Sequence, residues 1–116
     1  MAIRHAYRRG DVVFVPLLYS GLHARKHRPA VVVSSDDYHE EWDELLVIAV
    51  TSQAPKSRRA TDIALRDWQS AGLSQPSWVR SHLATIDRRV IQGLLGRLSP
   101  ADLAAVESCI RVATAL

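Results

Sequence analysis

Ala30-Val31-Val32-Val33-Ser34 decides the fold, because this short run of β-branched residues directly follows Pro29 and is apolar at consecutive positions. β-branched side chains favour extended backbone. Apolar residues that do not alternate with polar ones indicate a strand covered on both faces. Leu45 to Val50 is a second run of this kind, and it ends at Thr51-Ser52-Gln53. These two stretches predict central strands of a closed or covered sheet.

Other short runs extend the pattern along the chain. Val12 to Val15 is expected to be a strand that ends at Pro16, because proline cannot donate to a sheet ladder. Three further strands are predicted over residues 61–65, 78–86 and 93–98. Residues 17–27 and the acidic stretch 35–44 are expected to be connections, and a short turn or helix is expected over 68–73. Five or six short strands predict a small barrel of mainly antiparallel strands.

One helix is expected at the C-terminal end. Ser99 is suited to cap it, Pro100 to occupy its first position, and Asp102 to lie in its first turn. Apolar residues then recur on one side, at Leu103, Val106, Ile110 and Ala113. The predicted fold is therefore mainly β, a β-barrel with a C-terminal α-helix that packs on it.

The length and composition set the class of protein. A chain of 116 residues suits one domain, here residues 1–116. The longest apolar run, Leu45 to Val50, is too short to span a bilayer, and no secretory signal is recognisable, so a cytoplasmic location is expected. A single cysteine, Cys109, excludes an internal disulfide and a CxxC pair.

Charge is segregated along the chain. Residues 1–30 hold six Lys or Arg against one acid, whereas residues 36–44 hold six Asp or Glu and no Lys or Arg. The chain becomes basic again from Lys56, and its formal net charge is +3. Segregated basic charge can steer a polyanion to one face of a protein, so nucleic-acid binding is one of the functions that this pattern allows.

Motifs for metals and nucleotides are missing. The sequence holds no HExxH, no GxxxxGK[ST], and no GxGxxG after a strand. His23 and His27 lie in a predicted loop without the further ligands of a zinc site, and the acidic stretch is interpreted as a solvated segment. No metal or other cofactor is therefore predicted. A Ser-His-Asp triad stays open, although no nucleophile-elbow pattern supports it.

Several local motifs, in their order along the chain, resemble the MazF/PemK family of toxin endoribonucleases. They are Arg9-Gly10-Asp11-Val12-Val13, Arg28-Pro29-Ala30-Val31-Val32-Val33-Ser34, Val50-Thr51-Ser52-Gln53, Thr85-Ile86-Asp87 and Gly96-Arg97-Leu98-Ser99. The resemblance covers residues 8 to 113. It implies an SH3-like barrel with a terminal helix, usually a homodimer, which cuts single-stranded RNA at short sequences. It also implies inhibition by a cognate antitoxin whose acidic tail covers the cleavage groove.

The resemblance implies two catalytic residues, Arg28 and Thr51. RNA can be cut by its own 2′-hydroxyl, so the protein need only align the attack and stabilise the charge that grows on the phosphate. A guanidinium can donate two parallel hydrogen bonds to phosphate oxygens. The alternatives are that Arg28 is a solvated loop residue or pairs with the acidic stretch, and that Thr51 only caps the end of a strand.

Further candidates surround these two residues. His23 and His27 are the candidate acid and base, because histidine can exchange a proton near neutral pH. Contact with the RNA is expected from Arg25, Lys26, Ser52, Gln53, Arg58 and Arg59. Trp68 and Trp78 could stack on bases, but tryptophan in so small a protein is more often part of the core.

The chain also departs from the family. Plasmid-type members often carry an arginine and an aspartate where this sequence has Val79 and Ser81, and Arg80 lies one residue away, on the expected opposite face. Three hypotheses therefore stay open. The first is a ribonuclease toxin that acts through Arg28 and Thr51. The second is a barrel of this family that binds RNA or an antitoxin without cutting. The third is a toxin of the same fold that poisons gyrase.

Overall fold

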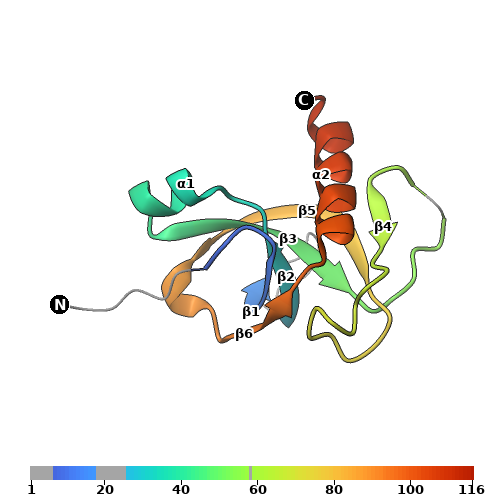
Figure 1. Cartoon of the computed structure of the whole chain (residues 1–116), viewed down its shortest axis with the longest axis horizontal. Helices are drawn as coiled ribbons and strands as arrows, with labels where there is room; N and C mark the ends of the chain where they lie inside the picture. The colour runs from blue at the N-terminus through green and yellow to red at the C-terminus, as the bar shows by residue number, and fades with distance from the viewer. Residues whose placement is uncertain (1–6, 18–25, 58) are drawn as a thin grey trace.

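The computed structural model describes residues 7–17, 26–57 and 59–116, which form one antiparallel sheet of six strands and a long C-terminal helix (Figure 1). The order of strands across the sheet is β4-β5-β3-β2-β1-β6. The strands are β1 (Asp11–Leu17), β2 (Lys26–Val32), β3 (Glu44–Thr51), β4 (Asp62–Ala64), β5 (Trp78–Asp87) and β6 (Gly93–Arg97). The helices are α1 (Asp36–Glu41), the single 3-10 turn η1 (Arg88–Val90) and α2 (Pro100–Thr114). The prediction of a mainly β fold with a C-terminal helix is confirmed.

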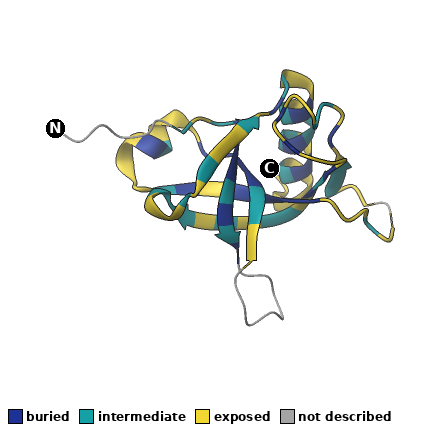
Figure 2. Ribbon diagram, turned by 90° about the horizontal axis from the view of Figure 1, so that it is seen from below, coloured by how far each residue is buried: buried dark blue, intermediate teal, exposed yellow. Residues whose placement is uncertain are grey.

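The sheet curls until its two ends approach one another, although β4 and β6 are not paired with each other in the described part of the chain (Figure 2). The connection between β4 and β5 lies directly against β6. At this contact a Cβ on Gly72 would stand 1.9 Å from the carbonyl oxygen of Leu95, and a Cβ on Gly96 would stand 2.3 Å from that of Ala71. Only glycine allows two backbones to approach so closely.

Two apolar clusters cover the two faces of the central strands. One holds Val12, Val31, Ile48 and Val50, and lies under Val106 of α2. The other occupies the opposite face and holds Val13, Val15, Val32, Leu45 and Val47. Neighbouring residues of one strand enter different clusters because side chains alternate between the faces of a sheet. This arrangement explains why the apolar runs do not alternate with polar residues.

The helix α2 begins as the sequence predicts. The hydroxyl of Ser99 accepts the N–H of Asp102 at 3.2 Å, and Pro100 opens the helix. Val106 is fully buried, and Leu103 and Ile110 pack against the same cluster. Ala113, the last residue of the predicted stripe, is exposed. None of the described helices is long and apolar enough to cross a membrane.

The predicted strand boundaries at Pro16 and Pro29 are wrong. β1 continues through Pro16 to Leu17, and β2 already starts at Lys26 and includes Pro29. β6 pairs with β1 only as far as Phe14, and β3 pairs with β2 only from Ala30 onward. Each proline therefore lies where its strand has a neighbour on one side only, and its missing N–H costs the sheet no ladder bond there.

The acidic stretch is also more ordered than predicted. Instead of a plain connection it contains α1, whose cap is the Ser35 side chain, which accepts the N–H of Tyr38 at 3.2 Å. A short turn or helix was expected over residues 68–73, and these residues form hydrogen-bonded turns. Trp68 within them packs against the core, so its interpretation as a core residue is confirmed.

Candidate functional site

The ladder between β2 and β3 ends at the pair Ala30 and Ala49, although both strands run on. Beyond this pair β2 stays with β1 and β3 stays with β5, so a gap opens between them. We call this gap the strand fork. Two residues past the last pair lie Arg28 on β2 and Thr51 on β3, at matching register positions. The fork therefore places the two predicted catalytic residues opposite one another.

A pocket of about 260 Å³ occupies the strand fork, and both residues line it. Arg28 is half-buried, whereas Thr51 is only 7% exposed. The hydroxyl oxygen of Thr51 accepts the backbone N–H of Gln53 at 3.1 Å. Since this bond uses the oxygen as an acceptor, the hydroxyl proton stays available for a ligand. The pocket thus offers a fixed positive charge and an oriented hydroxyl donor.

His27 lies at the edge of the same pocket. It belongs to β2, not to a loop as predicted, and its ring stacks on Phe14 with the ring centroids 5.8 Å apart. The side chain is exposed. With Ser52, which also lines the pocket, the structure therefore brings four of the predicted site residues together. His23 and Arg25, which the sequence analysis also proposed, lie outside the described residues.

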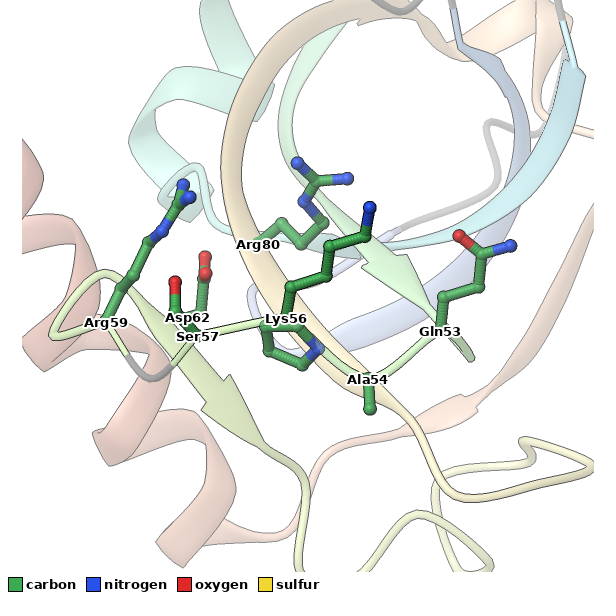
Figure 3. Close-up of a pocket in the computed structure, with 8 residues that line it drawn as sticks. Gln53, Ala54, Lys56, Ser57, Arg59, Asp62 and Arg80 are labelled. Carbon is green, nitrogen blue, oxygen red and sulfur yellow. The ribbon is translucent and has the colours of Figure 1, made fainter.

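A second pocket, of about 250 Å³, adjoins the first along the chain (Figure 3). Ser52 lines the strand fork, and the next residue, Gln53, lines the second pocket together with Arg59. Of the other predicted RNA contacts, Lys26 is exposed at the start of β2 and lines neither of these pockets. Arg58 lies outside the described residues.

Several lining residues were not among the predicted site residues. Gln75 and Ser77 reach the strand fork from the connection between β4 and β5, and only the tertiary fold brings them there. Lys56 and Arg80 line the second pocket. Lys56 lies where the sequence becomes basic again, so its charge could have been used to predict it. Arg80 points away from the buried Val79, as the alternation of a strand predicts, but only the tertiary fold brings it beside Lys56.

No group of three or more His, Cys, Asp or Glu side chains within residues 7–17, 26–57 and 59–116 is placed to hold a metal ion.

Comparison with known proteins gives a family. Residues 8–114 match the profile of the PemK-like, MazF-like toxins of type II toxin–antitoxin systems. The chain belongs to this family. The resemblance inferred from the local motifs is thus confirmed, and so is the prediction of an endoribonuclease-toxin family.

Solved structures of this family share the fold. An endoribonuclease from a mycobacterial species, in complex with its cognate antitoxin, has a TM-score of 0.76 at 19% identity, over 96% of this chain and 97% of that one. MazF from Deinococcus radiodurans has a TM-score of 0.77 at 21% identity, over 97% and 100%. The Mycobacterium tuberculosis toxin MazF-mt6 has a TM-score of 0.72 at 21% identity, over 91% and 97%. At identities this low, the TM-scores show a common fold and nothing more.

Proposed function

We propose that this chain is an endoribonuclease toxin that cuts single-stranded RNA without a metal ion, with the scissile phosphate held in the strand fork. The observation that carries the proposal is the placement of Arg28 and Thr51 opposite one another around one pocket. A phosphodiester there would meet a permanent cation from one strand and a hydroxyl from the next. These are the two groups that an RNA phosphate needs in order to be stabilised as its charge increases.

The substrate supplies its own nucleophile in this mechanism. The 2′-oxygen forms a bond to the adjacent phosphorus while the bond from phosphorus to the 5′-oxygen breaks. One fragment then ends in a 2′,3′-cyclic phosphate and the other begins with a 5′-hydroxyl. The proton lost by the 2′-hydroxyl is balanced by the proton that the 5′-oxygen gains, so no other reactant is consumed. Arg28 donates to the non-bridging oxygens, and Thr51 donates to one of them or orients the 2′-hydroxyl.

His27 is the described residue best placed to move a proton. Its ring lies in the wall of the strand fork, and stacking on Phe14 limits its orientations. A histidine can accept the proton of the 2′-hydroxyl with one ring nitrogen and return a proton to the leaving oxygen. His23 remains the second candidate for this role.

Single-stranded RNA and an antitoxin are the partners we propose. The loop that follows Thr51 carries the exposed residues Ser52, Gln53 and Arg59, whose donors can hold the RNA backbone on either side of the scissile phosphate. The same cationic surface suits an acidic, partly disordered antitoxin segment that folds as it binds. The mycobacterial relative has been solved with its cognate antitoxin, which supports this assignment.

We also propose a homodimer. Leu46 and Leu83 are 37% and 45% exposed, and register places both on the sheet face of Ile48, which α2 covers only in part. Exposed apolar residues on one face of a small protein are typical of a surface that a partner covers. Association of two copies through this face would bury them.

Cleavage of RNA in excess EDTA tests the proposal. Purified protein should cut single-stranded RNA with the chelator present, and Arg28→Ala should lower the single-turnover rate about 10²–10³-fold, because one preorganised donor is lost. Arg28→Lys should give an intermediate rate, since it keeps the charge but not the two parallel donors. Arg66→Gln, in an exposed arginine paired with Asp67, is the control and should cleave normally. Cleavage that stops in EDTA, or that survives Arg28→Ala unchanged, would contradict the mechanism.

One observation favours a second candidate, a barrel that binds without cutting. Val79 is fully buried, and the hydroxyl of Ser81 donates to the carbonyl of Thr61. Neither position can therefore serve as the acid or base that other family members have there. Retardation of RNA without cleavage in the same assay would support this candidate.

A further inference from the structure

Arg80 lies beside an irregularity in the pairing of β5 with β3. The register is regular as far as Ile48 and Leu83 and resumes at Val50 and Val79. Three residues of β5, 80–82, therefore stand opposite the single residue Ala49. Such a bulge changes where side chains point and is found next to functional sites. Here Val79 is fully buried, and the next residue, Arg80, is exposed.

The pocket beside Arg80 is basic, and we call it the basic pocket. It is lined by three cations, Lys56, Arg59 and Arg80, and by one carboxylate, that of Asp62. Figure 3 shows the side chains of Lys56 and Arg80 extending to the same side of β5. Although Asp62 and Arg80 are register partners, the three cations form no ion pair within the described part of the chain. Their charge is available to a ligand.

The basic pocket lies within reach of the strand fork. Thr51 and Ser52 line the fork, and Gln53 lines the basic pocket. Two residues of chain span at most about 7 Å, and residues 52 and 53 form a bend, so the two pockets lie close together. A single strand of RNA that places one phosphate at Thr51 can therefore bring a neighbouring phosphate to Arg80.

We propose that Arg80, with Lys56 and Arg59, forms a second phosphate subsite that anchors the RNA backbone next to the scissile phosphodiester. This inference rests on the proposed function, because it assigns a neighbour to the phosphate in the strand fork. A contact to a phosphate away from the reacting atoms supplies affinity and register rather than base recognition. Arg80 is a positioning residue in this assignment, and Asp62 opposes it by partly neutralising the pocket.

Two measurements test the subsite. The first is the affinity, over a range of salt concentrations, for a short fluorescent single-stranded RNA whose 2′-hydroxyls are all methylated and which therefore cannot be cut. Arg80→Gln should weaken binding and reduce the slope of log K against log salt by about 0.7, the value for one phosphate contact on a single strand. Asp62→Asn should tighten binding. The second is steady-state cleavage, in which Arg80→Gln should raise KM and leave kcat within about twofold of wild type.

Arg89→Gln is the matched control, since Arg89 carries the same charge beyond the opposite end of β5 and pairs with Asp87. Arg89→Gln should change neither the slope of log K against log salt nor the KM for cleavage. If Arg80→Gln behaves like this control while Arg28→Ala abolishes cleavage, the subsite is wrong and the proposed function stands. Binding that depends on Arg80 in a protein that cuts no RNA would support the subsite and refute the cleavage. If Arg80→Gln weakens binding to an acidic antitoxin peptide but leaves RNA binding intact, the subsite is wrong and Arg80 contacts a protein instead.

Discussion

At the scale of single residues, the contacts of Thr51 at the end of β3 fix the position of its hydroxyl. It pairs with Trp78 of β5, which fixes its backbone, and its side-chain oxygen accepts the N–H of Gln53. These contacts hold one hydroxyl in the wall of the strand fork before any substrate arrives. A donor that needs no reorganisation stabilises growing charge better than a mobile one.

We therefore expect Thr51→Val, which keeps the shape but removes the hydroxyl, to lower the cleavage rate about 10²–10³-fold. Thr51→Ser should retain most of the rate. Single-turnover cleavage of RNA measures both variants, and circular dichroism should confirm that both keep the fold. Equal rates for Thr51→Val and the wild type would show that Thr51 only ends a strand and does not contribute to cleavage.

At the scale of elements, α1 is held to the sheet by a buried polar contact. His39, only 9% exposed, lies with its Nε2 atom 2.5 Å from the hydroxyl oxygen of Ser34, which also accepts the N–H of Leu46 on β3. The guanidinium of Arg88 donates to the carbonyls of His39 and Trp42. Burial, and then the charge of Arg88, lower the pKa of His39 below its usual 6.5, and Asp36 opposes this shift only in part.

This shift predicts a pH dependence of stability. As the pH falls through about 6.5, the unfolded chain takes up a proton at His39 that the folded protein resists. The unfolded state then binds more protons, so the free energy of unfolding should decrease below about pH 6.5. Urea unfolding between about pH 5 and 8 measures the effect. His39→Gln should be less stable at neutral pH and should show a shallower decrease, whereas an unchanged pH profile would contradict the assignment.

At the scale of the whole molecule, the curl of the sheet depends on one close approach of backbones. Gly72 has a φ of +82° and lies against the carbonyl of Leu95 in β6. This contact packs the connection between β4 and β5 on the far edge of the sheet. The same connection supplies Gln75 and Ser77 to the strand fork. The packing of this connection therefore determines both the curl of the sheet and part of the lining of the strand fork.

Gly72→Ala should destabilise the protein by at least about 2 kcal/mol, because alanine resists a positive φ and its Cβ would collide with a carbonyl oxygen. Gly93→Ala is the matched control. Nothing lies within 4 Å of a Cβ at Gly93, so its effect should stay below about 1 kcal/mol. Chemical unfolding measures both variants. Similar losses for the two would show that the contact at Gly72 does not hold the sheet edges together.

Local sequence was enough to predict most of the strands, the last helix and the family. The apolar runs around Val31 and Val47 predicted doubly covered strands, because burial on both faces leaves a continuous pattern in the chain. The cap at Ser99 predicted the start of α2, because a helix end must be satisfied by nearby side chains. Arg28 and Thr51 were predicted as site residues from the motifs around them.

The boundaries at Pro16 and Pro29 were not predictable in this way, since a proline is tolerated or excluded according to which neighbours a strand has. Whether Arg80 meets Lys56 depends on where the loop after β3 packs, and the position of Gln75 depends on where the connection between β4 and β5 packs. The sequence by itself determined which segments are extended, where the last helix starts and which residues can carry the chemistry. Only the tertiary structure decided which of those residues meet in one pocket, because register, bulges and strand divergence are properties of pairs of segments.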